Sequence, residues 1–218
     1  MKKILLSLVA VLLLGLTVPL ARANGINIVN GDFSAPVTMT NSTPYYGSWE
    51  TGVVPGWTVT DPIGGAGIFA PSASIFPSIP GGGSQIAWAD TDASLSQDVG
   101  PLSANTSYMY SVYVGQRLDN LVANYTITLL DGSTVLASLT GSNGAVTPGG
   151  WQLETLSFST GSNVSGDLDI TLSSSGQQSD FADDSVEISS TPEPATLVMF
   201  GSGLLGLAGV FRRKLKTL

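Results

Sequence analysis

Carboxylates are the only side chains in this sequence suited to act as catalytic acids or bases near neutral pH. The chain contains no histidine and no cysteine, so it lacks the usual general base, the commonest zinc ligand and a thiolate nucleophile. Glycoside hydrolysis needs two carboxyl groups on either side of one bond, normally supplied by separate elements of a cleft. Three aspartate pairs are instead close in sequence: Asp90 with Asp92, Asp167 with Asp169, and Asp183 with Asp184. We therefore predict that the protein is not an enzyme.

Aromatic side chains near carboxylates form the second group with recognisable chemistry. Sugar rings stack on aromatic faces, while carboxylates and amides accept hydrogen bonds from sugar hydroxyls. Tyr45, Tyr46 and Trp49 cluster in a Gly- and Pro-rich context, and Trp88 is followed closely by Asp90. These four aromatic residues are candidate ligand-binding residues. Ordinary packing in a hydrophobic core is the alternative interpretation.

The elements that must hold these side chains are predicted to be β-strands. The region is rich in Gly, Ser, Thr, Asn and β-branched residues, and no stretch of it keeps a 3.6-residue apolar period for three turns. Apolar residues alternate with polar ones most clearly in two places, at Tyr125, Ile127 and Leu129 and at Leu168, Ile170 and Leu172. One face of each of these strands should be buried.

Turn signals divide the region into short strands. The pair Asp131-Gly132 lies between the runs 124–130 and 134–139 and predicts a tight hairpin. Other strands are expected at 26–29, 57–60, 85–89, 94–99, 107–114, 151–159 and 181–188. This spacing predicts an all-β fold, a β-sandwich.

Two irregularities are expected within this sandwich. The apolar phase changes inside 151–159, which predicts a β-bulge near Glu154 and Thr155. The stretch 62–83 is rich in glycine and proline, which predicts a long surface loop.

The charge of the central region is strongly negative. Between residues 24 and 191 there are fifteen acidic residues and a single basic residue, Arg117, which gives a net charge of about −14. Such a surface repels nucleic-acid phosphates and anionic lipid headgroups. Nucleic-acid binding and peripheral membrane attachment are therefore excluded as functions.

The N-terminal segment has the pattern of a secretory signal. Lys2 and Lys3 precede an apolar run at 4–16, and the small-residue triplet Ala21-Arg22-Ala23 follows. Residues 1–23 are therefore predicted to be a helical signal peptide that is cleaved after Ala23. A retained membrane anchor is the alternative, although thirteen apolar residues are few for a membrane span.

The C-terminal segment predicts a membrane helix with a defined orientation. An uninterrupted apolar stretch at 195–211 would form a helix about 26 Å long, close to the lower limit for crossing a bilayer. The flanking motifs are Pro192-Glu193-Pro194 before it and the basic cluster Arg212, Arg213 and Lys214 after it. Because basic clusters stay in the cytoplasm, the acidic region should lie outside, in agreement with the N-terminal signal.

The order and spacing of these C-terminal parts resemble the PEP-CTERM sorting signal of Gram-negative bacteria. The resemblance covers residues 191–216 and implies processing by an exosortase, a membrane-embedded peptidase. It also implies association with exopolysaccharide or biofilm matrix. Pro192, Glu193, Pro194, Arg212, Arg213 and Lys214 are the residues that carry it.

The central region resembles jelly-roll domains of the galactose-binding-like and carbohydrate-binding-module type. The resemblance is carried by Asn30-Gly31-Asp32-Phe33, Gly56-Trp57 and the segments 95–99 and 183–186. It implies a structural calcium ion between the residue after the first motif, here Ser34, and an aspartate of the last strand. Asp183 and Asp184 are the candidates for that aspartate.

These interpretations define three parts: a signal peptide at 1–23, a jelly-roll-like β-sandwich at 24–190, and a sorting signal at 191–216 with a transmembrane helix at 195–211. We expect a non-catalytic envelope or matrix protein, sorted by an exosortase. It should be anchored in the inner membrane before processing and then lie at the cell surface or outside the cell. The alternative is a carbohydrate-binding module that retains exopolysaccharide.

Overall fold

The structure of the protein, a computed structural model, describes residues 26–61, 65–164 and 166–189. The predicted signal peptide at 1–23 and the sorting segment at 191–216 lie outside these residues. None of the helices within the described ranges is long and apolar enough to cross a membrane.

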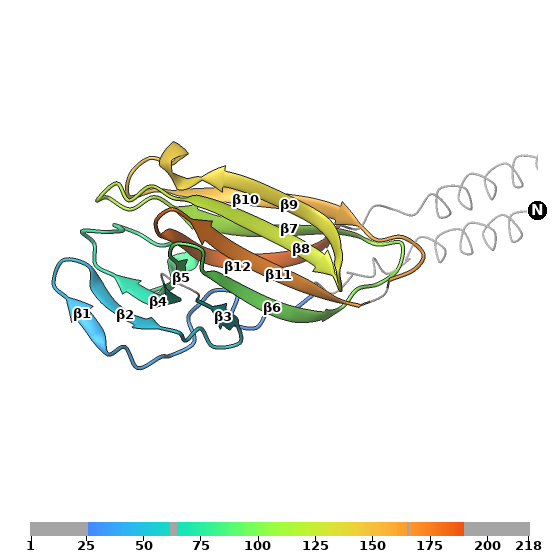
Figure 1. Cartoon of the computed structure of the whole chain (residues 1–218), viewed down its shortest axis with the longest axis horizontal. Helices are drawn as coiled ribbons and strands as arrows, with labels where there is room; N and C mark the ends of the chain where they lie inside the picture. Colours follow the sequence, from blue (N-terminus) through green and yellow to red (C-terminus); the bar gives the residue numbers. More distant parts are fainter. Residues whose placement is uncertain (1–25, 62–64, 165, 190–218) are drawn as a thin grey trace, which may run out of the picture.

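Two antiparallel sheets stack as a sandwich, with the long strands running side by side and the short strands β1, β2 and β4 gathered at one end (Figure 1). One sheet has seven strands in the order β1-β2-β4-β5-β12-β7-β10, and the other has five in the order β3-β6-β11-β8-β9. The strands are β1 (Asn41–Thr43), β2 (Gly47–Thr51), β3 (Thr58–Thr60), β4 (Ala66–Pro71), β5 (Ile86–Ala89), β6 (Ser94–Pro101), β7 (Ser107–Gly115), β8 (Asn124–Asp131), β9 (Thr134–Ser142), β10 (Trp151–Ser159), β11 (Asp167–Ser175) and β12 (Ser179–Ser189). Two short 3-10 turns, η1 (Pro80–Gly82) and η2 (Asn143–Ala145), interrupt the loops. The prediction of an all-β sandwich is confirmed.

The main hydrophobic core fills the space between the sheets. Tyr108, Tyr110, Phe33 and Phe181 are its largest fully buried side chains. The alternation predicted for β8 and β11 is confirmed, because their apolar residues are buried while the residues between them are partly exposed. The predicted hairpin is also confirmed, with Asp131 paired to Thr134 across a two-residue turn.

A second apolar cluster lies on the opposite face of the seven-stranded sheet. Its buried members are Phe69, Ile75, Phe76, Ile86, Trp88 and Ala182. Because successive side chains on a strand point to opposite faces, Phe181 enters the main core while Ala182 faces this second cluster. The seven-stranded sheet is therefore covered on both faces near β4 and β5, and this outer layer supports the candidate site.

The segment 26–29 was predicted to be a strand, and this prediction is wrong. The side chain of Gln97 on β6 takes the hydrogen bonds that a neighbouring strand would otherwise make. Its Oε1 accepts from the backbone nitrogen of Val29 at 2.8 Å, and its Nε2 donates to the carbonyl of the same residue at 2.9 Å. A side chain thus satisfies the backbone without a sheet ladder.

The segment 62–83 was predicted to be a surface loop, but it contains β4, which lies between β2 and β5 in the seven-stranded sheet. Residues 66–69 are buried there. Gly67 was one of the glycines that favoured a loop, but the strand pairing requires a glycine at this position. A Cβ on Gly67 would collide with the carbonyl oxygen of Glu50 on β2. Glycine here marks close approach of two backbones, not a turn.

The predicted bulge near Glu154 and Thr155 is also wrong, because β10 pairs with β7 in unbroken register from Trp151 to Ser159. The apolar phase changes for a different reason. Glu154 faces inward, 8% exposed, and its Oε1 accepts a hydrogen bond from the Tyr125 hydroxyl at 2.6 Å. Leu153 faces solvent, 48% exposed. A buried glutamate with a partner therefore takes a position where an apolar residue was expected.

Candidate functional site

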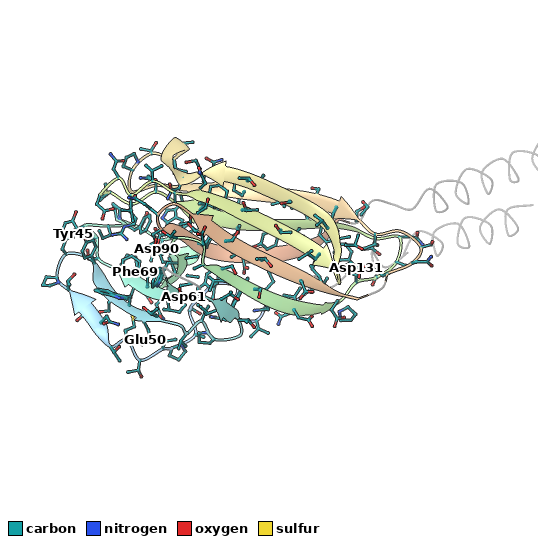
Figure 2. The ribbon with its side chains drawn as sticks, in the orientation of Figure 1. Tyr45, Glu50, Asp61, Phe69, Asp90 and Asp131 are labelled. Atoms are coloured by element: carbon teal, nitrogen blue, oxygen red, sulfur yellow. The ribbon has the colours of Figure 1, made fainter. Side chains whose placement is uncertain are left out.

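The principal candidate site is a cleft of about 320 Å³ on the outer face of the seven-stranded sheet. It lies at the end of the sandwich where β1 and β2 are found, and Figure 2 shows Phe69 and Asp90 near each other there. The cleft is lined by Tyr46, Trp49, Phe69, Trp88, Asp90, Arg117, Asp119, Leu121 and Gln178. Four aromatic rings and three charged groups thus share one concave surface.

Strand register explains how the aromatic rings come together. Trp49 on β2 pairs with Phe69 on β4, which brings their side chains to the same face. In the next row, Trp88 on β5 lies between Gly67 on β4 and Asp180 on β12. The rings therefore form a wall built on strands, which fix their positions better than loops would.

Arg117 is fixed in one orientation within this cleft. Its Nε donates to Oδ1 of Asp119 at 3.0 Å and its Nη2 donates to Oδ2 at 2.7 Å, so the pair is bidentate. Its Nη1 donates to Oε1 of Gln178 at 2.9 Å. The guanidinium carbon lies 5.2 Å from the ring centre of Tyr46 and 5.8 Å from that of Phe69. A bidentate ion pair between two aromatic faces orders this side of the cleft.

Asp180 lies beneath the cleft and is completely buried. Its Oδ1 accepts a hydrogen bond from Nε2 of Gln178 at 2.6 Å, and its Oδ2 has no hydrogen-bond partner within the structure as described. Burial raises the pKa of Asp180 to about 7. The charge of Arg117 and the hydrogen bond from Gln178 lower this pKa, while the negative charges of Asp119 and Asp90 raise it slightly. The carboxyl is therefore partly protonated at neutral pH.

The structure brings three of the four predicted ligand-binding residues into this cleft. Tyr46, Trp49 and Trp88 line it, whereas Tyr45 does not. Tyr45 is exposed and meets the ring of Tyr46 edge-on, with ring centres 4.9 Å apart. Whether any of the four binds a ligand stays a prediction.

Of the aspartates considered for catalysis, only Asp90 lines the cleft. Asp90 lines the cleft, whereas its sequence neighbour Asp92 does not. Asp169 lies on the five-stranded sheet opposite Asp98, and its pKa is raised by burial and by the negative charges of Asp98 and Asp167. That pair belongs to a different sheet from the cleft.

Five residues of the cleft were not anticipated from the sequence: Phe69, Arg117, Asp119, Leu121 and Gln178. Phe69 was placed in a predicted loop. Arg117 and Gln178 are 61 positions apart, so only the fold makes them neighbours. The sequence contained one signal for Arg117. It is the only basic residue between residues 24 and 191, so an ion pair with an acidic side chain was to be expected.

A second hollow, of about 360 Å³, surrounds the predicted calcium residues Asp183 and Asp184 and also includes Asp32. Asp183 has a left-handed backbone, φ 46°, where the register of β12 shifts between Ala182 and Ser185. Asp184 is 6% exposed; its Oδ2 accepts from the Tyr110 hydroxyl at 3.3 Å, and its Oδ1 has no partner in the described parts of the chain. Burial raises the pKa of Asp184 well above its usual range, and the charges of Asp183 and Asp32 add to this.

This second hollow suits a calcium ion in its donor chemistry. The unpaired oxygen of Asp184 is a hard ligand, and no cation offsets the neighbouring carboxylates. Gly31 keeps the space open, because a Cβ there would lie 2.5 Å from Oδ1 of Asp184. Ser34 instead donates to Asp32, from its backbone nitrogen at 3.1 Å and its hydroxyl at 2.6 Å, which lowers the pKa of Asp32. Among the residues with described positions, no three acidic side chains form a group that could hold a metal, so carbonyl oxygens or water would have to complete the shell.

Comparison with known families gives two matches along the chain. The model of the family described as HpiC1 cyclase matches residues 24–189. The model of the PEP-CTERM protein-sorting motif matches residues 190–214. No curated protein matches the sequence.

Solved structures similar to this one come from carbohydrate-active proteins. An arabinose-bound α-L-arabinofuranosidase, MgGH51, superposes with a TM-score of 0.51 at 14% identity, covering 77% of this chain and 27% of the enzyme. A CBM4 structure gives 0.43 at 18% identity, covering 75% of this chain and all of the module. TmCBM61, in complex with β-1,4-galactotriose, gives 0.45 at 18% identity, covering 62% of this chain and 90% of the module. The chain spans about a quarter of the arabinofuranosidase, and the likeness is one of fold: the jelly-roll type of β-sandwich.

Proposed function

We propose that this chain, which belongs to the HpiC1-like family through residues 24–189 and carries a PEP-CTERM sorting motif at 190–214, is an exported protein that binds carbohydrate in its aromatic cleft. The observation that carries the proposal is the cleft itself, where Tyr46, Trp49 and Trp88 adjoin polar groups of fixed orientation. Concave aromatic surfaces with a few oriented polar groups are typical of ligand sites. The ligand we propose is exopolysaccharide of the extracellular matrix.

The sorting motif implies an exported protein that passes through the membrane and is processed by an exosortase. In our proposal the segment 195–211 anchors the chain in the inner membrane before cleavage. The cleaved protein then reaches the cell surface or the medium, where the acidic sandwich meets the glycans of the matrix.

Ring-closing catalysis is the second candidate, because the matching family is described as a cyclase. One observation favours it: Asp180 has a pKa of about 7, which suits a proton donor, and aromatic faces can stabilise a cation formed nearby. However, Asp180 is fully buried and does not line the cleft, so Gln178 would have to move before a substrate could reach it. Binding without chemistry is therefore the function that the geometry supports better.

Polysaccharide pull-down and glycan-array measurements on the purified protein test the binding proposal. Replacing a hot-spot aromatic residue at the centre of a binding site costs about 2 kcal/mol or more, so Trp49→Ala should weaken binding by about thirtyfold or more. Tyr45→Ala is the matched control, because Tyr45 is an exposed aromatic residue outside the cleft, and its binding should stay within about twofold. Equal losses in both variants, or no binding by the parent, would contradict the proposal.

We also propose that Asp184, with Asp183 beside it, holds a structural calcium ion. Excess calcium at about 100 times its Kd should stabilise the fold by about 2.7 kcal/mol, which for a domain of this size is a rise of several degrees in Tm. Asp184→Asn should remove most of this rise, while Asp61→Asn, at an exposed position, should keep it. Thermal melts with calcium and with a chelator measure the effect. Identical melting temperatures in the two conditions would show that the carboxyl of Asp184 acts without a metal.

A further inference from the structure

We propose that the cleft selects uncharged glycans and rejects those that carry carboxylates, such as uronate-containing polysaccharides. This inference rests on the proposed carbohydrate function and adds the class of sugar to it. It follows from how the charges around Arg117 are arranged.

The single cation of the cleft is already neutralised. Arg117 is 6% exposed and its guanidinium is paired with Asp119 through two hydrogen bonds. A third N–H is held by Gln178, and Tyr46 and Phe69 lie against the cation. A uronate would have to displace Asp119 to reach this charge, and breaking a desolvated, bidentate pair costs more than a single exposed ion pair returns.

The other charged groups at the cleft are negative. The charge of Asp119 is balanced by Arg117, which leaves Asp90 at the cleft and the partly ionised Asp180 beneath it. The sequence has no other basic residue between residues 24 and 211 to balance these two. A carboxylate entering this low-dielectric space would meet repulsion that an uncharged sugar does not feel.

Uncharged sugars, in contrast, meet groups that suit them. Oδ1 of Asp90 accepts hydrogen bonds from the nitrogen and hydroxyl of Thr91, at 2.8 and 3.3 Å. No hydrogen bond to its Oδ2 is found in the described parts of the chain, and Asp90 lines the cleft, so this oxygen can accept from a sugar hydroxyl in our proposal. The rings of Trp49 and Trp88 supply the apolar faces. Neither a hydrogen bond from a sugar hydroxyl to the carboxylate nor stacking on an indole ring requires a net charge on the ligand.

The test compares sugars that differ only in charge. Soluble galactan, mannan and β-glucan are each prepared in three forms: native, oxidised to the carboxylate at C6, and methyl-esterified after oxidation. Binding to the full-length protein is measured by calorimetry at low and high salt. For each glycan that binds in its native form, we expect the oxidised form to bind at least about tenfold more weakly, and the ester to recover most of the loss. The difference should shrink in high salt, because repulsion is screened.

Two variants separate the role of Arg117 from that of total charge. Asp119→Asn frees the cation and should strengthen binding of the oxidised form severalfold, whereas Asp90→Asn removes one negative charge without touching Arg117 and should do so less. Equal or tighter binding of the oxidised form by the parent would overturn the charge selectivity while leaving the carbohydrate function standing. Binding of none of the nine preparations would overturn both. The parent comparison decides the question even if a variant fails to fold.

Discussion

Asp180→Asn is expected to make the protein more stable at pH 8 by about 4 kcal/mol. The carboxyl is fully buried, and its pKa in the folded protein is about 7 against 3.8 for the free side chain. This gap corresponds to about 4 kcal/mol by linkage between protonation and folding. An asparagine keeps the shape and the hydrogen bond with Gln178 but never ionises. The buried negative charge, and with it the cost of burying that charge, is removed.

The direction of the pH dependence follows from the raised pKa. Below about pH 3 the carboxyl is protonated in both the folded and unfolded states and contributes no pH dependence. As the pH rises from about 4 to about 7, the unfolded state gives up the proton first, so the folded protein loses stability; above the folded-state pKa the loss is constant. The groups facing Asp180 are Arg117, Asp119 and Asp90, with Gln178 as its hydrogen-bond partner.

Denaturant unfolding of parent and variant at pH 4, 6 and 8 measures this effect. The gain from Asp180→Asn should be near zero at pH 4 and largest at pH 8. Asp61→Asn is the control, because Asp61 is exposed and does not line the cleft, and its stability should follow that of the parent. A gain independent of pH, or a loss at pH 8, would mean that Asp180 is stabilising in its ionised form. If the variant also keeps its glycan affinity, Asp180 has no direct role in binding.

Local sequence signals predicted those parts of the fold that local physics determines. The hairpin at Asp131 and Gly132 depends on a turn that requires a positive φ, and Gly132 has a φ of 59°. The buried faces of β8 and β11 follow from strict alternation. In both cases a few residues that are neighbours in the sequence determine the local structure.

The prediction failed where distant residues decide the outcome. Gly67 was taken as a loop residue, but it is a strand residue that allows the backbone of β2 to approach. Glu154 was taken as the site of a bulge, but it faces inward because Tyr125, 29 positions away, binds it. Neither partner can be identified from the sequence around the residue concerned.

The candidate site shows the same division. Aromatic residues in a polar context were a usable signal, and Tyr46, Trp49 and Trp88 do line one cleft. The sequence could not separate Tyr46 from Tyr45, because both precede β2 and only the turn geometry decides which ring points over Arg117. Asp180 was missed because its role depends on burial beneath the cleft, and Gln178 was missed because its partner Arg117 is distant in the sequence.

Replacing Pro192, Glu193 and Pro194 with three alanines is expected to abolish processing of the protein. Proline has no amide hydrogen and disfavours helix at the residue before it, so Thr191 to Glu193 should be extended outside the membrane, where a peptidase can reach the backbone. Alanine is the best helix former, so three alanines should extend the predicted helix at 195–211 outward and remove the predicted extended site. The match of residues 190–214 to the PEP-CTERM motif supports this role.

The parent and the triple-alanine variant are produced in a host that has the exosortase. Their mature masses show whether each form has been cleaved. The parent should lose its C-terminal segment, and the triple-alanine form should keep it and stay in the membrane fraction.

A second variant changes Arg212, Arg213 and Lys214 to glutamate. It removes the charges that we predict hold the far end in the cytoplasm, so it should disturb the orientation of the segment. It should leave the melting of the sandwich unchanged, because the strands of both sheets come from residues 41–189. If the triple-alanine form is trimmed like the parent, the Pro-Glu-Pro triplet is only a linker to an ordinary membrane anchor.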